Sequence, residues 1–337
     1  MSEQRPQSKA RIVTRGSQLA LWQANYVTDL LKMQNVESEL NIVKTMGDRV
    51  QDRFLHEMGG KGLFVRELEE ALKANTADLA VHSLKDLPAK LPEGFTLAAI
   101  LKRHIPNDVI IFHPKKDFMK KLSSNPTIGR AEFASLGKLT IATASLRRQS
   151  LLRGLKTGIN MVAVRGNVDT RIRKLEESNW DALILAGASI ERLGLTGLPH
   201  KLIDLEWFTP CAAQGALAIE TTLTNEYRDV VSKLKDPRTY ACATLERKVL
   251  EMLGGDCTMP FGAFFEYDEK RKKTEARAVV LDYEGEEVRV ELGFPDLPEK
   301  LNIEVTAQKI LTALEAAGVA EIMKRLEAAP PSMGEIH

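Results

Sequence analysis

Short apolar runs alternate with helical periodicities through the first two thirds of the chain. Residues 11–14 are predicted to form a strand, and residues 20–31 carry apolar side chains at helical spacing. Further strands are predicted at residues 39–45, 79–81, 96–100, 109–112, 139–143, 161–164 and 181–186. Strands that alternate with helical segments indicate an α/β fold with mostly parallel sheets.

The last third of the chain has a different pattern. A return strand is predicted at residues 216–220, followed by one long helical run over residues 223–253. Three strands and then one or two helices are predicted at residues 261–266, 276–282, 287–292 and 303–326. Consecutive strands followed by helix are typical of a small α+β domain.

One stretch, D-L-A-V-H-S-L-K-D-L-P at residues 78–88, joins a buried strand to a dense polar cluster. In open α/β sheets, ligands bind beyond the carboxyl ends of the strands. Ser83 and Lys85 offer donors to an anion, whereas Asp86 offers a carboxylate to a cation. The alternative is a helix that begins at a Ser83 cap, with Lys85 and Asp86 as solvated charges.

Arginines recur where predicted strands give way to helices. Arg15 lies in such a turn, next to a helix that Ser17 is expected to cap. A cap at Ser145 would place Arg147 and Arg148 in the first helical turn, where cations are unfavourable unless an anion is near. Arg165 ends the strand predicted at residues 161–164, Arg171 lies one helical face beyond it, and Arg192 ends the short helix that follows the strand predicted at residues 181–186. This recurrence predicts a ligand with several carboxylates or phosphates, which guanidinium groups bind in bidentate fashion.

Residues 46–62 form a long polar segment rich in glycine, which is typical of an active-site lid. Lys61 lies between Gly60 and Gly62, so the lid is expected to carry one cation. The segment does not match the Walker pattern, which needs four residues between its glycines and Ser or Thr after the lysine.

Length and charge narrow the class of protein. The chain has 337 residues, which predicts two or three domains, and a net charge of +1, which argues against a general nucleic-acid binder. No apolar run approaches the ~20 residues of a membrane helix, and the N-terminal residues lack a signal-peptide core. We therefore expect a cytoplasmic protein with no membrane partner. Cys257, in a Gly/Pro-bounded loop, is either a small buried residue or a reactive thiol.

Seven motifs, in order along the chain, resemble those of one family. They are RIVTRGSQLALWQ (11–23), GGKGLF (59–64), AVHSLKDLP (80–88), TASLRRQ (143–149), RGNVDTR (165–171), RLGL (192–195) and CTMP (257–260). The family is that of porphobilinogen deaminase, also called hydroxymethylbilane synthase. The resemblance runs from about residue 10 to about residue 325.

The resemblance implies an enzyme that joins four porphobilinogen molecules head to tail, with release of ammonia, to give hydroxymethylbilane. It implies a dipyrromethane primer held as a thioether on Cys257. Asp86 would interact with the pyrrole nitrogens and stabilise the azafulvene cation that forms when ammonia leaves. Lys61 would belong to the mobile loop. The residues implied to contact acetate and propionate groups, or otherwise to touch primer or substrate, are Arg15, Ser17, Ser83, Lys85, Arg147, Arg148, Arg165, Arg171 and Arg192.

The resemblance also implies three domains. Two lobes would resemble periplasmic binding proteins, with mixed, mostly parallel sheets, and a C-terminal α+β domain would carry the cofactor. The expected boundaries are 10–104 plus 202–221, then 105–201, then 222–330. We expect a monomer with porphobilinogen as its small-molecule partner and no metal.

Three positions depart from the family pattern. Asp256 replaces a glycine before the cofactor cysteine, and its charge disfavours the thiolate, so primer attachment is expected to be slowed. Ala213 stands where a glycine is usual, and Glu57 where some relatives carry lysine. The main competing hypothesis is a non-catalytic two-lobed protein that binds a polycarboxylate, which would leave Cys257 and Asp86 without roles.

Overall fold

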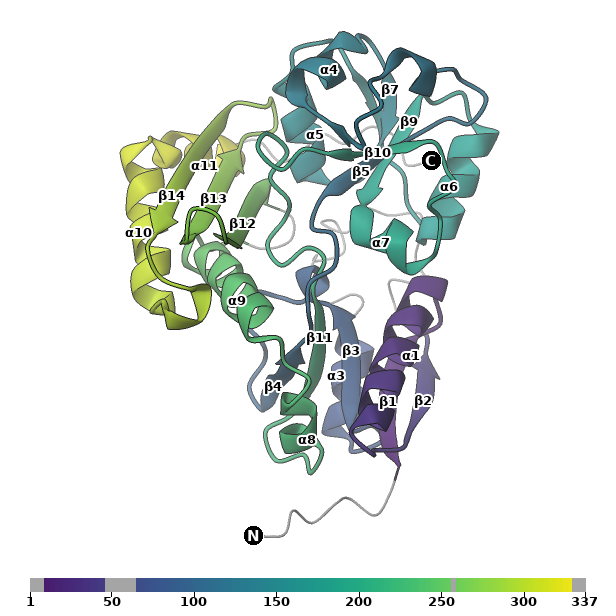
Figure 1. The fold of residues 1–337 in the computed structure, drawn as a ribbon, viewed down its shortest axis with the longest axis vertical. Helices are drawn as coiled ribbons and strands as arrows, with labels where there is room; N and C mark the ends of the chain where they lie inside the picture. The colour runs from purple at the N-terminus through teal and green to yellow at the C-terminus, as the bar shows by residue number, and fades with distance from the viewer. Residues whose placement is uncertain (1–8, 46–64, 256–258, 329–337) are drawn as a thin grey trace.

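The computed structural model describes residues 9–45, 65–255 and 259–328. Within these ranges the strands form three separate sheets. Figure 1 shows the first sheet at the bottom, the second at the upper right and the third at the left. The mixed α/β character and the division into two lobes plus a C-terminal unit agree with the sequence prediction.

The first lobe is built on a five-stranded sheet of order β2-β1-β3-β11-β4. Its strands are β1 (Ala10–Arg15), β2 (Ser38–Val43), β3 (Leu79–Ser83), β4 (Phe95–Ile100) and β11 (Leu217–Thr222), and its helices are α1 (Gln18–Met33), α3 (Arg66–Lys73) and α8 (Arg228–Ser232). β1 runs parallel to β2 and β3, whereas β11 lies antiparallel between β3 and β4. The predicted return strand is therefore confirmed, since the chain leaves this sheet after β4 and re-enters it as β11.

The second lobe has a six-stranded sheet of order β6-β10-β5-β9-β7-β8. Its elements are β5 (Asp108–Phe112), η2 (Met119–Lys121), β6 (Thr127–Ile128), α4 (Arg130–Ser135), β7 (Thr140–Ala142), α5 (Leu146–Arg153), β8 (Asn160–Val162), α6 (Val168–Glu177), β9 (Ala182–Ala186), α7 (Gly187–Arg192) and β10 (His200–Ile203). β6, α4 and β10 lie outside the strands and helices that hydrophobic periodicity predicts. β10 runs to Ile203 and so includes the first two residues expected to return to the first lobe.

The C-terminal unit packs helices on a three-stranded antiparallel sheet. It comprises α9 (Pro237–Met252), β12 (Phe261–Asp268), β13 (Lys273–Leu281), β14 (Glu287–Phe294), η3 (Pro298–Lys300), α10 (Ile303–Ala316) and α11 (Val319–Ala328). The prediction of one helical run over residues 223–253 was wrong. α8 ends at Ser232, and α9 begins at Pro237 with an Asp236 cap that accepts a hydrogen bond from the Thr239 N–H. Proline suits this first helical position because its missing N–H would have no helical partner there.

A buried carboxylate joins the C-terminal unit to the first lobe and to the segment that returns to it. Glu246 on α9 forms an ion pair with Arg103, which follows β4, at 2.9 Å between Oε1 and Nη1. It also accepts hydrogen bonds from the backbone N–H groups of Ala213 and Phe265, at 2.6 and 2.9 Å. Burial raises the pKa of Glu246, although Arg103 opposes the shift. Ala213 adopts φ +63°, a left-handed backbone that favours glycine, so this contact holds a strained residue in place.

The second lobe and the C-terminal unit meet at two glycines. Gly285, in the turn between β13 and β14, has φ +92°, and an added Cβ would overlap the backbone nitrogen of Gly154. Arg153 fixes the same turn by donating from Nη1 to the Tyr283 carbonyl at 2.6 Å. Only glycine lets the two backbones approach this closely.

We expect Gly285→Ala to lower the free energy of unfolding by about 2–4 kcal/mol, because strain at positive φ and a backbone clash add together. Gly158→Ala is the matched control, since Gly158 has φ +73° and no atom within 4 Å of an added Cβ. The control variant should lower the free energy of unfolding by only about 1 kcal/mol. Denaturant unfolding of both variants measures the difference, and equal losses would contradict a close contact between the two units.

Candidate active site

The first cluster of candidate residues lies at the carboxyl ends of β1 and β3. Arg15 is the last residue of β1, and Ser17 caps α1 by accepting a hydrogen bond from the Ala20 N–H at 3.3 Å. Ser83 ends β3, and its hydroxyl accepts from Nε2 of Gln23 on α1 at 2.9 Å. The strand-to-helix turns therefore bring Arg15, Ser17 and Ser83 to one end of the first sheet, as the sequence predicts.

Lys85 and Asp86 follow in a single turn of 3-10 helix, η1 (Leu84–Asp86). Ser83 occupies the cap position of this turn but makes no side-chain cap hydrogen bond, so the alternative of a Ser83-capped helix is wrong. Lys85 Nζ donates to Gln214 Oε1 at 3.3 Å, in the segment that leads back to β11. Asp86 is exposed, and its negative charge acts to raise the pKa of Arg171 and of Arg192, against the effect of burial.

His82 does not belong to this cluster. Successive side chains on a strand point to opposite faces, so His82 and Ser83 diverge. His82 Nε2 lies 2.9 Å from Glu220 Oε2 on β11, and both side chains are almost completely buried. The histidine of this motif therefore faces the interior of the lobe, away from Ser83.

The arginine pair of the second lobe surrounds one buried aspartate. Asp108, at the start of β5, lies 2.7 Å from Arg147 Nη2 and 2.7 Å from Arg148 Nη2. Burial acts to raise the pKa of Asp108, but the two guanidinium groups outweigh it and lower the pKa overall. Ser145 caps α5 as predicted, and the anion expected near its first turn is this carboxylate. Sequence reasoning missed Asp108, because a single aspartate at the start of a strand carries no local signal.

Two buried guanidinium groups around one carboxylate leave a net positive charge. Arg147 Nη1 also donates to the Thr209 carbonyl at 2.7 Å, and Arg148 Nη1 to the Ile184 carbonyl at 3.0 Å. Gln214 Nε2 donates to Asp108 Oδ1 at 3.2 Å and so connects this pair to Lys85. The network links the η1 turn of the first lobe to α5 of the second.

Asp108→Asn is expected to lower the free energy of unfolding by about 3–5 kcal/mol, because it leaves two buried cations without a countercharge. Asp117→Asn serves as control, since Asp117 forms an exposed ion pair with Lys120. This variant should lower the free energy of unfolding by less than about 1 kcal/mol. Thermal unfolding at neutral pH compares the two variants. If Asp108→Asn lowered the free energy of unfolding no more than the control does, burial of the two arginines would not depend on this carboxylate.

Arg171 and Arg192 are poorly neutralised. Burial, with a smaller contribution from the positive charges of Arg148 and Arg165, lowers the pKa of Arg171 to about 10, and Asp86 opposes the shift. Burial likewise lowers the pKa of Arg192 to about 10, while Glu191 and Asp86 oppose the shift. Arg171 Nε donates to the Gly166 carbonyl at 2.7 Å, and Arg192 Nη2 to the Gly215 carbonyl at 2.8 Å. A bound anion would therefore stabilise the charged form of both guanidinium groups.

The positive charges of the described arginines are thus suited to binding a ligand with several carboxylates. Among the residues that the structure describes, Arg147 Nε and Arg192 Nε are buried without a hydrogen-bond partner. No group of three His, Cys, Asp or Glu residues suited to a metal ion occurs in the same part of the chain. Nor do the described helices include one long and apolar enough to cross a membrane.

Some predicted residues lie outside the described ranges. These are Lys61 and Cys257, together with the departures Glu57 and Asp256. Of the other cysteines, Cys242 is buried, and burial raises the pKa of its thiol to about 12. Cys211 is half-buried, with its sulfur 3.5 Å from Gln214 Oε1.

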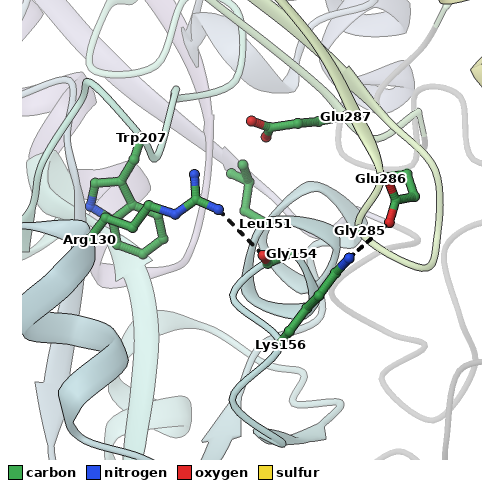
Figure 2. Close-up of a pocket in the computed structure, with 8 residues that line it drawn as sticks. All are labelled: Arg130, Leu151, Gly154, Lys156, Trp207, Gly285, Glu286 and Glu287. Carbon is green, nitrogen blue, oxygen red and sulfur yellow. Dashed lines mark hydrogen bonds and ion pairs between the residues drawn. The ribbon is translucent and has the colours of Figure 1, made fainter.

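A separate cavity of about 220 Å³ lies between the second lobe and the C-terminal unit (Figure 2). Its wall includes Trp207, Arg130 and Leu151, with Lys156 paired to Glu286 at 3.2 Å. None of the candidate site residues lines it. The cavity is therefore distinct from the cluster around Asp86.

A family model described as "Porphobilinogen deaminase, dipyromethane cofactor binding domain" matches residues 10–228. The chain belongs to the porphobilinogen deaminase family. The match covers both lobes, from β1 to the start of α8, and so includes every described candidate residue. The cofactor of this family domain is the dipyrromethane predicted from the sequence motifs.

Curated relatives support the same family. The porphobilinogen deaminase of Sulfurimonas denitrificans is 38% identical over 95% of this chain and 98% of its own length. That of Legionella pneumophila strain Philadelphia 1 is 43% identical over 82% of this chain and 86% of its own. Among solved structures, substrate-binding domain 2 of Lactococcus lactis GlnP is 9% identical, with a TM-score of 0.40 over 75% of this chain and 94% of that one.

Proposed function

We propose that this chain is a hydroxymethylbilane synthase, which joins four porphobilinogen molecules head to tail with release of ammonia. Membership of the porphobilinogen deaminase family supports this activity over the non-catalytic binding protein. The observation that carries the chemical assignment is the position of Asp86. It is an exposed carboxylate at the end of η1, just after β3, and its negative charge acts on the guanidinium groups of Arg171 and Arg192 in the second lobe.

Asp86 is the proposed catalytic residue. Loss of ammonia from the aminomethyl group leaves positive charge on the pyrrole, and a fixed carboxylate stabilises that charge as it develops. The same carboxylate can accept a hydrogen bond from a pyrrole N–H.

The remaining candidates are proposed to bind acidic side chains of cofactor and substrate. Each pyrrole unit brings two carboxylates, so a growing chain requires many cations. Support comes from Arg171 and Arg192, which have no ion pair with a carboxylate among the described residues and whose pKa values burial lowers. The set comprises Arg15, Ser17, Ser83, Lys85, Arg147, Arg148, Arg165, Arg171 and Arg192, with Lys61 assigned to the active-site loop.

Cys257 is proposed as the attachment point of the dipyrromethane, which supplies the primer that is extended. We also propose three domains near the predicted boundaries of 10–104 plus 202–221, 105–201 and 222–330, with β10 through Ile203 assigned to the second lobe and α8 to the first, whose core it packs against. We further propose a monomer that acts in the cytoplasm. The three separate sheets support the division into domains.

Incubation of the purified chain with porphobilinogen tests the activity. We expect consumption of substrate, release of one ammonia per molecule consumed, and a linear tetrapyrrole product. Calorimetry on the same sample measures binding. Binding without consumption would replace this proposal with the non-catalytic polycarboxylate-binding protein.

A further inference from the structure

A cluster of aromatic rings and one imidazole links the first lobe to the second beside the proposed site. Trp22 and Tyr26 lie on successive turns of α1, with ring centroids 5.3 Å apart and nearly parallel planes. The His104 ring meets both edge-on, at 5.7 and 6.0 Å. His104 belongs to the crossover segment between β4 and β5, so the cluster joins α1 to the connection between the lobes.

The cluster continues into α7 of the second lobe. His104 Nδ1 lies 3.1 Å from Glu191 Oε2. The next residue, Arg192, places its guanidinium carbon 5.9 Å from the Trp22 ring centroid. A cation over the face of an aromatic ring is attracted by the negative charge of that face.

One backbone carbonyl organises these contacts. The Gly215 oxygen accepts from the His104 N–H at 3.1 Å and from Arg192 Nη2 at 2.8 Å. Gly215 has φ +88°, and an added Cβ would lie 2.7 Å from the His104 carbonyl oxygen. The crossover segment, the returning segment and α7 therefore converge on the Arg192 guanidinium.

Arg192 itself lacks a direct carboxylate partner among the described residues. Its Nε is buried without a hydrogen bond, and its side chain is only 5% exposed. The contacts that hold it are a carbonyl and an aromatic face, both of which leave its positive charge available to a ligand. Such an arrangement fixes a flexible side chain before the ligand arrives, which lowers the entropic cost of binding.

We propose that Trp22 and the His104–Glu191 pair are positioning residues, which hold Arg192 in place for a carboxylate of the incoming pyrrole substrate. The inference rests on the proposed function, since it assigns Arg192 to substrate. Trp22 presents the ring face, whereas His104 and Glu191 fix the relation of α7 to α1. None of the three needs to touch the substrate.

Steady-state kinetics with porphobilinogen tests this role. Trp22→Leu removes the ring face, so we expect KM to rise about ten-fold with kcat within about two-fold of the parent. Trp22→Phe keeps an aromatic face, so its KM should stay close to that of the parent. Glu191→Gln should raise KM about three-fold, because it removes the charge beside His104. Met33→Ala, at an exposed position on the same helix, is the control and should leave both constants unchanged.

A double-mutant cycle separates positioning from a general structural effect. If Trp22 acts through Arg192, Trp22→Leu should change KM less than about two-fold in an Arg192→Lys background. An equal rise in KM in both backgrounds would overturn the inference, as would an unchanged KM in Trp22→Leu. Should Trp22→Leu fail to fold, Glu191→Gln carries the test, and a parental KM in that variant would overturn the inference.

Calorimetric binding of porphobilinogen distinguishes this inference from the proposed function. A parent that binds but does not turn over the substrate would overturn the catalytic assignment alone, and a weaker affinity in Trp22→Leu would still support positioning. A parent that neither binds nor consumes porphobilinogen would overturn both.

Discussion

Asp86→Asn is expected to reduce turnover of porphobilinogen by about 10³-fold, because the amide cannot stabilise positive charge on the pyrrole as ammonia leaves. The effect should fall on kcat, since the arginines that bind the substrate carboxylates remain. Asp86 is exposed at the end of η1, so the fold should tolerate the change. Thermal unfolding and the intact mass should match those of the parent, with the cofactor still attached.

The control for this variant is Asp29→Asn, which alters an exposed carboxylate on α1. It should retain parental kinetics. Near-parental turnover in Asp86→Asn would refute the catalytic role. A loss of activity together with a loss of cofactor mass would instead assign Asp86 to primer attachment.

The second large effect is expected for Cys257→Ser. The parent should carry the added mass of one dipyrromethane per chain, and the serine variant none, because a hydroxyl is a much weaker nucleophile than a thiolate. Loss of the primer should also abolish product formation. Intact-mass measurement before and after incubation with porphobilinogen tests both statements.

Cys211→Ser is the matched control, since Cys211 is half-buried whereas Cys242 is buried. It should keep the cofactor. Cys242 is an unsuitable anchor, because burial raises the pKa of its thiol to about 12. Asp256→Gly should speed loading if the neighbouring charge disfavours the thiolate. Cofactor mass retained in Cys257→Ser would place the attachment elsewhere.

Local sequence patterns predicted most of the fold. Apart from β6 and β10, the described strands of both lobes lie within about two residues of the predicted ranges, because short apolar runs bounded by polar turns form buried strands. β6 and α4 were missed since they are short and lie in the polar segment 115–137, which carries little periodicity. The split of the long helical run was missed because Pro237 is compatible with a helix start as well as with an interruption.

The sequence by itself determined which residue types stand at the strand ends, because caps, turns and periodicity act over only a few residues. From these local signals, arginines are predicted near the ends of strands, and Asp86 is predicted just after a buried strand. Only the tertiary structure decided which charges neutralise one another. Asp108 reaches Arg147 and Arg148 from 39 and 40 residues away, whereas Arg192 meets a carbonyl and an aromatic ring rather than a carboxylate. Such partners are set by strand order and by the crossing of the chain between lobes, which no local pattern encodes.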